Sequence, residues 1–190
     1  MRRMITFVFS LFFAASFVTA QEKPAAPSPA QTPAPPAAKA EDVSSPDAIL
    51  AALYDVISGP VGQKRDWDRF RSLFAPGARL IPTGRNAQTG EYRLTALTPE
   101  EYITRSGAFL EQSGFVEKEI ARRSERFGQV LHAFSTYEGR RAADPAPFVR
   151  GVNSIQLFSD GKRWWVVTVY WQAESPENPL PKEYLPAAKP

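Results

Sequence analysis

The chain contains one histidine, His132, and this side chain is a candidate acid–base group. It lies in a strand-like segment and shares one face with Val130, Phe134 and Thr136, because alternate residues of a strand point to the same side. If this face lines an apolar pocket, a neutral imidazole could take or give a proton there. If it faces the other way, His132 is a structural histidine, exposed or bonded to a neighbouring strand. The sequence leaves both interpretations open, and one histidine excludes a cluster of histidine metal ligands.

Residues 150–174 are rich in β-branched and aromatic side chains, which is typical of strands in a half-buried sheet. Two strands are expected here, joined by a turn at Ser159, Asp160 and Gly161. A three-residue loop with Gly161 in a left-handed conformation predicts one apolar face, made of Ile155, Leu157, Trp165, Val167, Val169 and Trp171. The opposite face is a candidate subunit interface, and it carries the mixed set of Ser154, Gln156, Phe158, Trp164, Thr168 and Tyr170.

A pocket enclosed by this sheet would contact its ligand through the apolar face. We expect the contacts at Trp165, Val167, Val169 and Trp171, although the two tryptophans are also explained as core residues. Further candidate hydrogen-bond donors, which are alternatively packing residues with a hydroxyl at the rim, are Tyr102 and Tyr137. No nucleophile elbow, phosphate-binding loop or metal-ligand spacing occurs, so we expect no cofactor and no metal.

Helices come first in the chain and strands second. Ser45, Pro46 and Asp47 predict a helix that ends at Gly59-Pro60. A second helix is expected over 66–74, and a capping box at residues 98–101 predicts a third that ends near Gly114. Brief strands are expected at 78–81 and 92–97, and four longer ones at 115–126, 129–138, 151–158 and 163–173. This order predicts an α+β domain.

The two ends of the chain differ from its middle. Two arginines, an apolar run and Val18-Thr19-Ala20 predict a Sec-type signal peptide at 1–20, cleaved after Ala20 or kept as a tether. The Pro/Ala-rich segment 21–45 is expected to be a disordered linker, and 175–190 a proline-rich tail that Leu180, Tyr184 and Leu185 could attach to the domain. We therefore expect one domain at 46–174, in the periplasm or secreted, with no stable membrane span after cleavage.

Charge and cysteine content narrow the class of protein. The 190 residues include 23 basic and 20 acidic ones, and the basic residues form no continuous stripe, which argues against a nucleic-acid partner. There is no cysteine, so the exported domain has no disulfide and depends on its core for stability.

Four stretches carry a resemblance to a known family: residues 70–80, 126–128, 134–138 and 151–172. Together with the element order, they resemble an exported bacterial branch of the nuclear transport factor 2-like (NTF2-like) superfamily, which includes SnoaL-like and ketosteroid-isomerase-like proteins. The resemblance spans roughly 46–174. It implies a cone of three N-terminal helices packed on a curved antiparallel sheet, a pocket between them, and often a dimer through the outer sheet face. It does not imply a function, because this fold hosts many.

The catalytic residues of the family can be compared with single positions of this chain. Ketosteroid isomerases place a general-base aspartate in a segment similar to residues 75–82, where this chain has Ile81 or Pro82, so that base is missing. The tyrosine that donates to the substrate oxygen in those enzymes corresponds to Tyr54, which is alternatively a packing residue with its hydroxyl toward solvent. The histidine/aspartate arrangement of SnoaL-type cyclases is not recognisable.

Three functions follow as hypotheses. The first is binding of a small hydrophobic molecule without catalysis. The second is a proton-transfer enzyme of the isomerase, dehydratase or cyclase type, with His132 as base and a tyrosine as donor. The third is a protein-interaction module that uses the outer sheet face, through which we also expect a homodimer.

Overall fold

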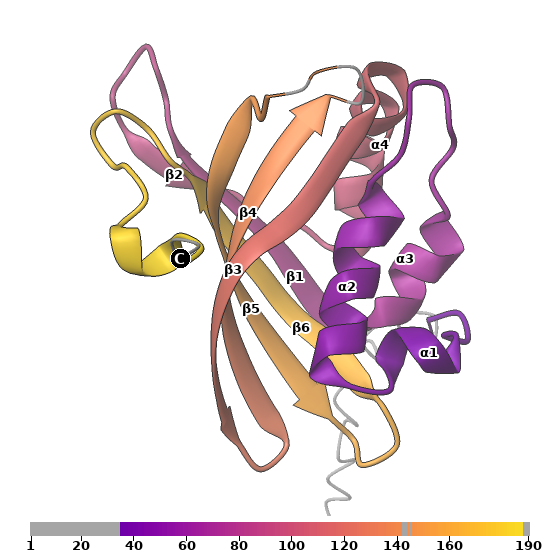
Figure 1. Ribbon diagram of the computed structural model, residues 1–190. Helices are drawn as coiled ribbons and strands as arrows, with labels where there is room; N and C mark the ends of the chain where they lie inside the picture. Colours follow the sequence, from indigo (N-terminus) through magenta and orange to yellow (C-terminus); the bar gives the residue numbers. More distant parts are fainter. Residues whose placement is uncertain (1–34, 142–143, 145, 188–190) are drawn as a thin grey trace, which may run out of the picture. The chain divides into compact units, whose positions relative to one another are not determined.

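The described part of the chain, residues 35–141, 144 and 146–187 of a computed structural model, forms helices packed on one sheet (Figure 1). Its helices are α1 (Ala40–Val43), α2 (Pro46–Ile57), α3 (Trp67–Leu73) and α4 (Pro99–Ser113), followed near the end by the 3-10 helix η1 (Lys182–Tyr184). Its strands are β1 (Phe74–Arg85), β2 (Tyr92–Leu94), β3 (Phe115–Phe127), β4 (Val130–Arg141), β5 (Val149–Ser159) and β6 (Trp164–Ala173). The predicted α+β class is confirmed. The expected signal peptide at 1–20 lies outside the described residues.

Capping side chains begin the three longer helices. The Ser45 hydroxyl accepts from the Ala48 amide at 3.0 Å at the start of α2, and Asp66 accepts from the Arg69 amide at 2.9 Å at the start of α3. Thr98 and Glu101 form the predicted capping box of α4. The apolar side of α2 then packs with α3 and the sheet around fully buried residues, which include Ile49, Phe70, Leu73, Ile155 and Val166.

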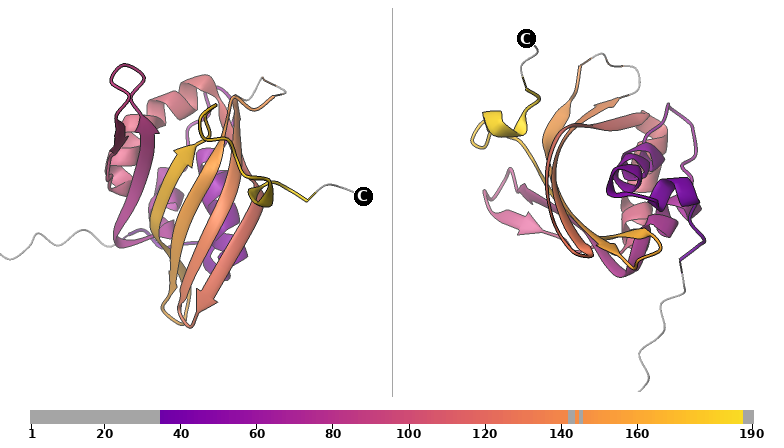
Figure 2. Two further views of the ribbon diagram at one scale, coloured as in Figure 1. Left: turned by 90° about the vertical axis from the view of Figure 1, so that its left-hand side faces the viewer. Right: turned by 60° about the horizontal axis from the view of Figure 1, so that its bottom comes forward.

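The sheet is mixed, with the strand order β2-β1-β6-β5-β4-β3. Strands β3 to β6 form the expected antiparallel meander. In contrast, β1 runs parallel to β6, with Leu80 opposite Val169, so the prediction of an antiparallel sheet is wrong at this pairing. The reason lies at Phe74, which is both the C-cap of α3 and the first residue of β1, so the helix fixes the direction of the strand. The sheet curls around the helices, as the right-hand view of Figure 2 shows.

A β-bulge changes the predicted register of β5 and β6. Ile155 pairs with Val169, so these two share a face as expected, but Leu157 pairs with Val166, so Val167 is an extra residue on β6. One inserted residue reverses the side-chain alternation beyond it. Trp164 and Val166 are therefore buried on the helix side, and the prediction that Trp165 and Val167 share the inner face is wrong.

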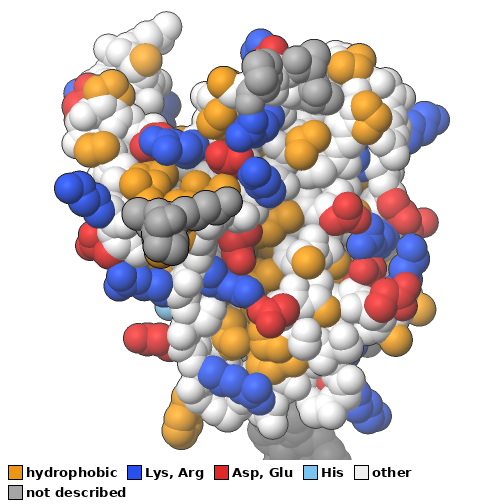
Figure 3. All heavy atoms as spheres, in the orientation of Figure 1, with side chains coloured by type: hydrophobic (Ala, Val, Ile, Leu, Met, Phe, Trp, Pro, Cys, Tyr) orange, Lys and Arg blue, Asp and Glu red, His pale blue; other side chains and the backbone are white. Residues whose placement is uncertain are grey.

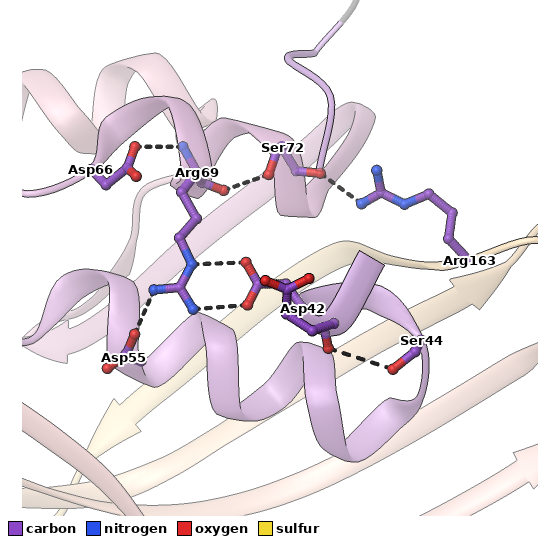
Figure 4. A network of polar contacts seen from close by, with 8 residues as sticks. Asp42, Ser44, Asp55, Asp66, Arg69, Ser72 and Arg163 are labelled. Carbon is purple, nitrogen blue, oxygen red and sulfur yellow. Dashed lines mark hydrogen bonds and ion pairs between the residues drawn. The ribbon is translucent and has the colours of Figure 1, made fainter. Parts of the chain in front are cut away.

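Helix α1 lies inside the segment predicted as a linker, so that prediction extends too far at its C-terminal end. The Arg69 guanidinium in α3 donates to both carboxylate oxygens of Asp42 in α1, each at 2.8 Å (Figure 4). It also donates to Asp55 in α2 at 2.5 Å. Val43 is buried beside this contact. A paired charge and an apolar contact together attach these residues to the domain.

The C-terminal segment lies on the face of the sheet that the helices leave open (Figures 1 and 2). The Thr136 hydroxyl donates to the Tyr184 carbonyl at 2.7 Å, and the Tyr184 ring packs edge-on against Phe134 with centroids 5.2 Å apart. The predicted role of Tyr184 in attaching the tail agrees with these contacts. Among the described residues, none of the helices has both the length and the apolar composition needed to cross a bilayer.

Candidate functional site

A cavity of about 270 Å³ lies between the helices and the inner face of the sheet. Helices α2, α3 and α4 and five of the strands contribute to its wall. Most of the lining is apolar or aromatic: Leu53, Tyr54, Ile57, Phe70, Leu80, Tyr102, Ser106, Phe109, Leu110, Phe115, Glu117, Tyr137, Phe148, Val149, Asn153, Val169 and Trp171. A concave, mostly apolar lining with a few polar groups is the usual form of a small-molecule site.

Glu117 is the one ionisable carboxyl group in this lining. It follows Phe115 by two positions on β3, so strand alternation turns both side chains toward the cavity. Burial disfavours the carboxylate and raises the pKa of Glu117 to about 7, although a hydrogen bond from Asn153 acts in the opposite direction. The Asn153 amide nitrogen lies 3.4 Å from Glu117 Oε1. Glu117 therefore exchanges a proton near neutral pH.

Tyr54 joins the cavity to a buried polar network. Its hydroxyl accepts a hydrogen bond from Asn153 Nδ2 at 3.0 Å and lies 2.7 Å from the hydroxyl of Ser135. Ser135 in turn donates to Glu119, two residues beyond Glu117 on β3. The network links α2 to β3, β4 and β5, and it holds the Tyr54 hydroxyl inside the fold rather than toward solvent. Burial raises the pKa of Tyr54, against the effect of its bond with Ser135, so the phenol stays protonated.

Two further tyrosines line the cavity. Burial raises the pKa of Tyr102 and of Tyr137, and the nearby Glu117 carboxylate adds to both shifts. Both phenols therefore remain neutral donors at physiological pH. Tyr102 is fixed by aromatic packing, stacked on Phe70 with centroids 5.4 Å apart and edge-on to Trp171 at 6.4 Å.

The predicted ligand-contacting residues divide into two groups. Tyr54, Tyr102, Tyr137, Val169 and Trp171 come together around the cavity. Trp165 and Val167 do not line it, because the bulge at Val167 turns the start of β6 over. Trp165 instead donates from Nε1 to Asp160 at 2.9 Å, and the Arg163 guanidinium lies 3.6 Å from the centre of its ring.

His132 lies on the opposite face of the sheet from the cavity. Its neighbours Leu131 and Ala133 are buried toward the helices, whereas His132 Nε2 is 3.1 Å from the Ser154 hydroxyl and its ring contacts Phe134 edge-on. The hypothesis of His132 as a base inside the pocket is therefore contradicted by its position, and the alternative of a structural histidine bonded to a neighbouring strand describes it.

Sequence reasoning missed Glu117 and Asn153. One signal for Glu117 was present, since Phe115, Glu117 and Glu119 alternate on a strand whose first residue is aromatic. A glutamate at such a position usually faces solvent, so only the curvature of β3 over α2 and α4 decides its burial. In the described part of the chain, no three His, Asp or Glu side chains come together as a metal site.

Neither a protein-family model nor a curated protein sequence matches this chain. Among solved structures, it is similar to an NTF2-like protein of unknown function from Silicibacter pomeroyi, with 13% identity, 69% of this chain and 94% of that chain covered, and a TM-score of 0.46. An NTF2-like protein of unknown function from Shewanella baltica is 16% identical, with 69% of this chain and 98% of that chain covered, and a TM-score of 0.40. A candidate ketosteroid isomerase from Parabacteroides distasonis is 8% identical, with 70% of this chain and 89% of that chain covered, and a TM-score of 0.45. These neighbours come from the superfamily that the sequence resembles. At such identities and TM-scores they assign no role to any residue.

Proposed function

We propose that the cavity binds one small, mostly apolar molecule that carries a hydrogen-bonding group. The observation that supports this most is the combination of an aromatic lining with a single carboxyl group, Glu117, at a polar spot beside Asn153. Benzene fills an engineered cavity of about 150 Å³, so about 270 Å³ suits a molecule of two fused rings. The polar spot would orient the molecule, and the aromatic wall would supply most of the binding free energy.

Two valines on the same strand provide a matched test of binding. Val169 lines the cavity and Val167 is exposed outside it. We expect 2-naphthol, a two-ring phenol, to bind the wild-type protein and Val167→Trp equally, and to lose binding to Val169→Trp because the larger side chain fills the cavity. Fluorescence titration of the naphthol measures this. Equal binding by both variants, or no binding by wild type, would contradict the proposal.

A second candidate function, proton transfer, is favoured by the raised pKa of Glu117. A carboxyl group with a pKa of about 7 is present in both protonation states at neutral pH, which suits a general acid–base. In such a reaction the Glu117 carboxylate takes a proton from carbon next to a carbonyl group. The electron pair moves to the carbonyl oxygen, where a neutral tyrosine such as Tyr102 or Tyr137 donates a hydrogen bond. Glu117 here takes the role first predicted for His132.

Deuterium exchange separates binding from catalysis. We expect wild-type protein to accelerate exchange at the carbon next to the carbonyl of 2-tetralone in D₂O, followed by NMR, with a rate that rises with pH through about 7. Glu117→Gln should abolish the acceleration, and Glu125→Gln, an exposed glutamate on the same strand, should not. Wild-type protein that binds naphthol but does not exchange tetralone would leave binding as the function of the cavity.

We also propose that the protein is exported, on the basis of the signal-peptide pattern at residues 1–20. N-terminal sequencing of the protein from a periplasmic or medium fraction tests this, and the expected first residue is Gln21. Intact Met1 in a cytoplasmic fraction would contradict it.

A further inference from the structure

One row of apolar side chains crosses the outer face of the sheet at its hairpin end. Phe127 pairs with Val130, Val130 with Phe158 and Phe158 with Trp165, so the four residues lie side by side across β3, β4, β5 and β6. Phe127 is 90% exposed, Val130 55% and Phe158 41%. We call these four residues the tip row. An exposed phenylalanine contributes little to the core, so the exposed position of Phe127 does not stabilise the fold.

The tip row is held rigidly by the two hairpin turns that flank it. The Ser159 amide donates to the Gln129 carbonyl at 2.9 Å, which joins one turn to the other. Asp160 accepts from the backbone amides of Lys162 and Arg163 and from the Trp165 indole. A surface fixed in this way loses little conformational entropy when it binds.

The apolar surface of the tip row is one residue deep, apart from the exposed bulge residue Val167 that adjoins it on β6. The next row on the same face is polar throughout, and consists of Glu125, His132, Gln156 and Thr168. A stable protein interface needs about 800 Å² from each partner, which a single row does not offer. A narrow apolar edge at the end of a domain suits shallow insertion into a lipid surface instead.

Basic residues also occur in the two hairpins that carry the tip row. The segments 123–130 and 158–165 contain four basic residues and two acidic ones, a net charge of +2. The basic ones are Arg123, Arg126, Lys162 and Arg163. Arg126 packs over the Trp164 ring and Arg163 donates to the Ser72 carbonyl at 2.6 Å, while the acidic Asp160 accepts from the amides of its own turn. Figure 3 shows orange and blue side chains together at its lower end, where Figure 1 places the hairpin turns. Exposed aromatic groups with a basic surround are the usual features of a surface that binds anionic headgroups.

We propose that the tip row docks the domain on an anionic lipid surface, with Phe127 inserted between headgroups. The proposal is independent of the cavity and of its ligand. Docking here would leave the helices and the cavity on the side of the sheet away from the inserted row.

Vesicle co-sedimentation tests this with residues 21–190, which keep every described helix and strand and lack the apolar leader. We expect binding to phosphatidylcholine vesicles that contain phosphatidylglycerol, weaker binding to phosphatidylcholine alone, and release at high salt. Phe127→Asp should weaken binding by about tenfold or more. The control Val61→Asp, at a valine 63% exposed in the loop between α2 and α3, should bind as wild type does.

A second variant keeps the test independent of folding. Phe127→Leu stays apolar and should bind nearly as wild type does, and circular dichroism melting should show Phe127→Asp to be folded. No binding by wild type, or equal binding by Phe127→Asp, would overturn the proposal. So would a wild-type dimer in light scattering that Phe127→Asp makes monomeric without vesicles, because the tip row would then be an interface between two copies.

Discussion

The side-chain amide of Asn153 donates to the hydroxyl of Tyr54 at 3.0 Å, and this bond ties the middle of β5 to helix α2 inside the cavity. The same amide nitrogen lies 3.4 Å from Glu117 on β3. One amide group thus orients the two polar residues that give the cavity its chemistry, a phenol that stays protonated and a carboxyl group that titrates near 7. The polar part of the site therefore depends on the packing of α2 against β3 and β5.

Glu117 makes folding stability depend on pH. Its folded pKa of about 7 lies above its ordinary value of 4.5, so between these pH values the folded state holds a proton that the unfolded state has released. Stability therefore falls as pH rises from 4.5 to about 7, by about 3 kcal/mol in total. We expect Glu117→Gln to lack this fall and to be more stable than wild type at pH 8, measured by urea unfolding across pH. Glu125→Gln is the control, and parallel pH profiles for wild type and Glu117→Gln would contradict the assignment.

The Tyr54 network should contribute cooperatively to stability. Tyr54→Phe removes one hydrogen-bond partner from Ser135 and one from Asn153, which keep Glu119 and Glu117 as their other partners. Two lost hydrogen bonds of about 0.5–1.5 kcal/mol each cost about 1–3 kcal/mol. Because Ser135 contacts Tyr54 directly, Tyr54→Phe and Ser135→Ala together should cost less than the sum of the two. A double-mutant cycle by chemical denaturation measures this coupling, and strictly additive effects would show that the two hydroxyls do not interact.

The contact between Asp42 and Arg69 should hold α1 in place only when Asp42 is ionised. Arg69 lowers the pKa of Asp42, mainly through its hydrogen bonds. The stabilisation is therefore fully present above the ordinary pKa of 3.8 and is lost as pH falls through the lower pKa of the folded state. We expect Asp42→Asn to cost about 1–3 kcal/mol and to speed amide exchange in α1. Asp55→Asn is the matched control, because Asp55 binds the same guanidinium but is 69% exposed, and its cost should stay below about 1 kcal/mol. Equal costs would contradict the role given to burial.

Gly151 should not tolerate a side chain. A Cβ atom there would overlap the Gln172 carbonyl oxygen and lie 2.7 Å from the Tyr137 hydroxyl and 2.8 Å from Ala173 Cα. Because two of these are backbone atoms, β5 and β6 would have to separate, and we expect Gly151→Ala to destabilise the fold by about 1–3 kcal/mol or more. Gly84→Ala on β1 is the control, since a Cβ there meets nothing within 4 Å. Thermal melting compares the two, and similar melting temperatures would contradict the expected clash.

The sequence by itself determined the elements. Caps such as Ser45 and the Thr98–Glu101 box act within a few residues of where they stand, and the apolar alternation of the last strands is equally local, so these features could be predicted. Tyr102, Val169 and Trp171 could be named as pocket residues because each lies on the apolar side of its own helix or strand, whereas Tyr54 was named from the family resemblance.

Only the tertiary structure decided which of these side chains face the cavity. A single bulge residue, Val167, turned Trp165 outward, and no local pattern distinguishes such an insertion from a regular strand. The direction of β1, the outward face of His132 and the burial of Glu117 all depend on contacts between residues distant in sequence. Glu117 owes its raised pKa to the desolvation that helices and sheet impose together, and this desolvation belongs to the assembled fold rather than to any segment of the chain.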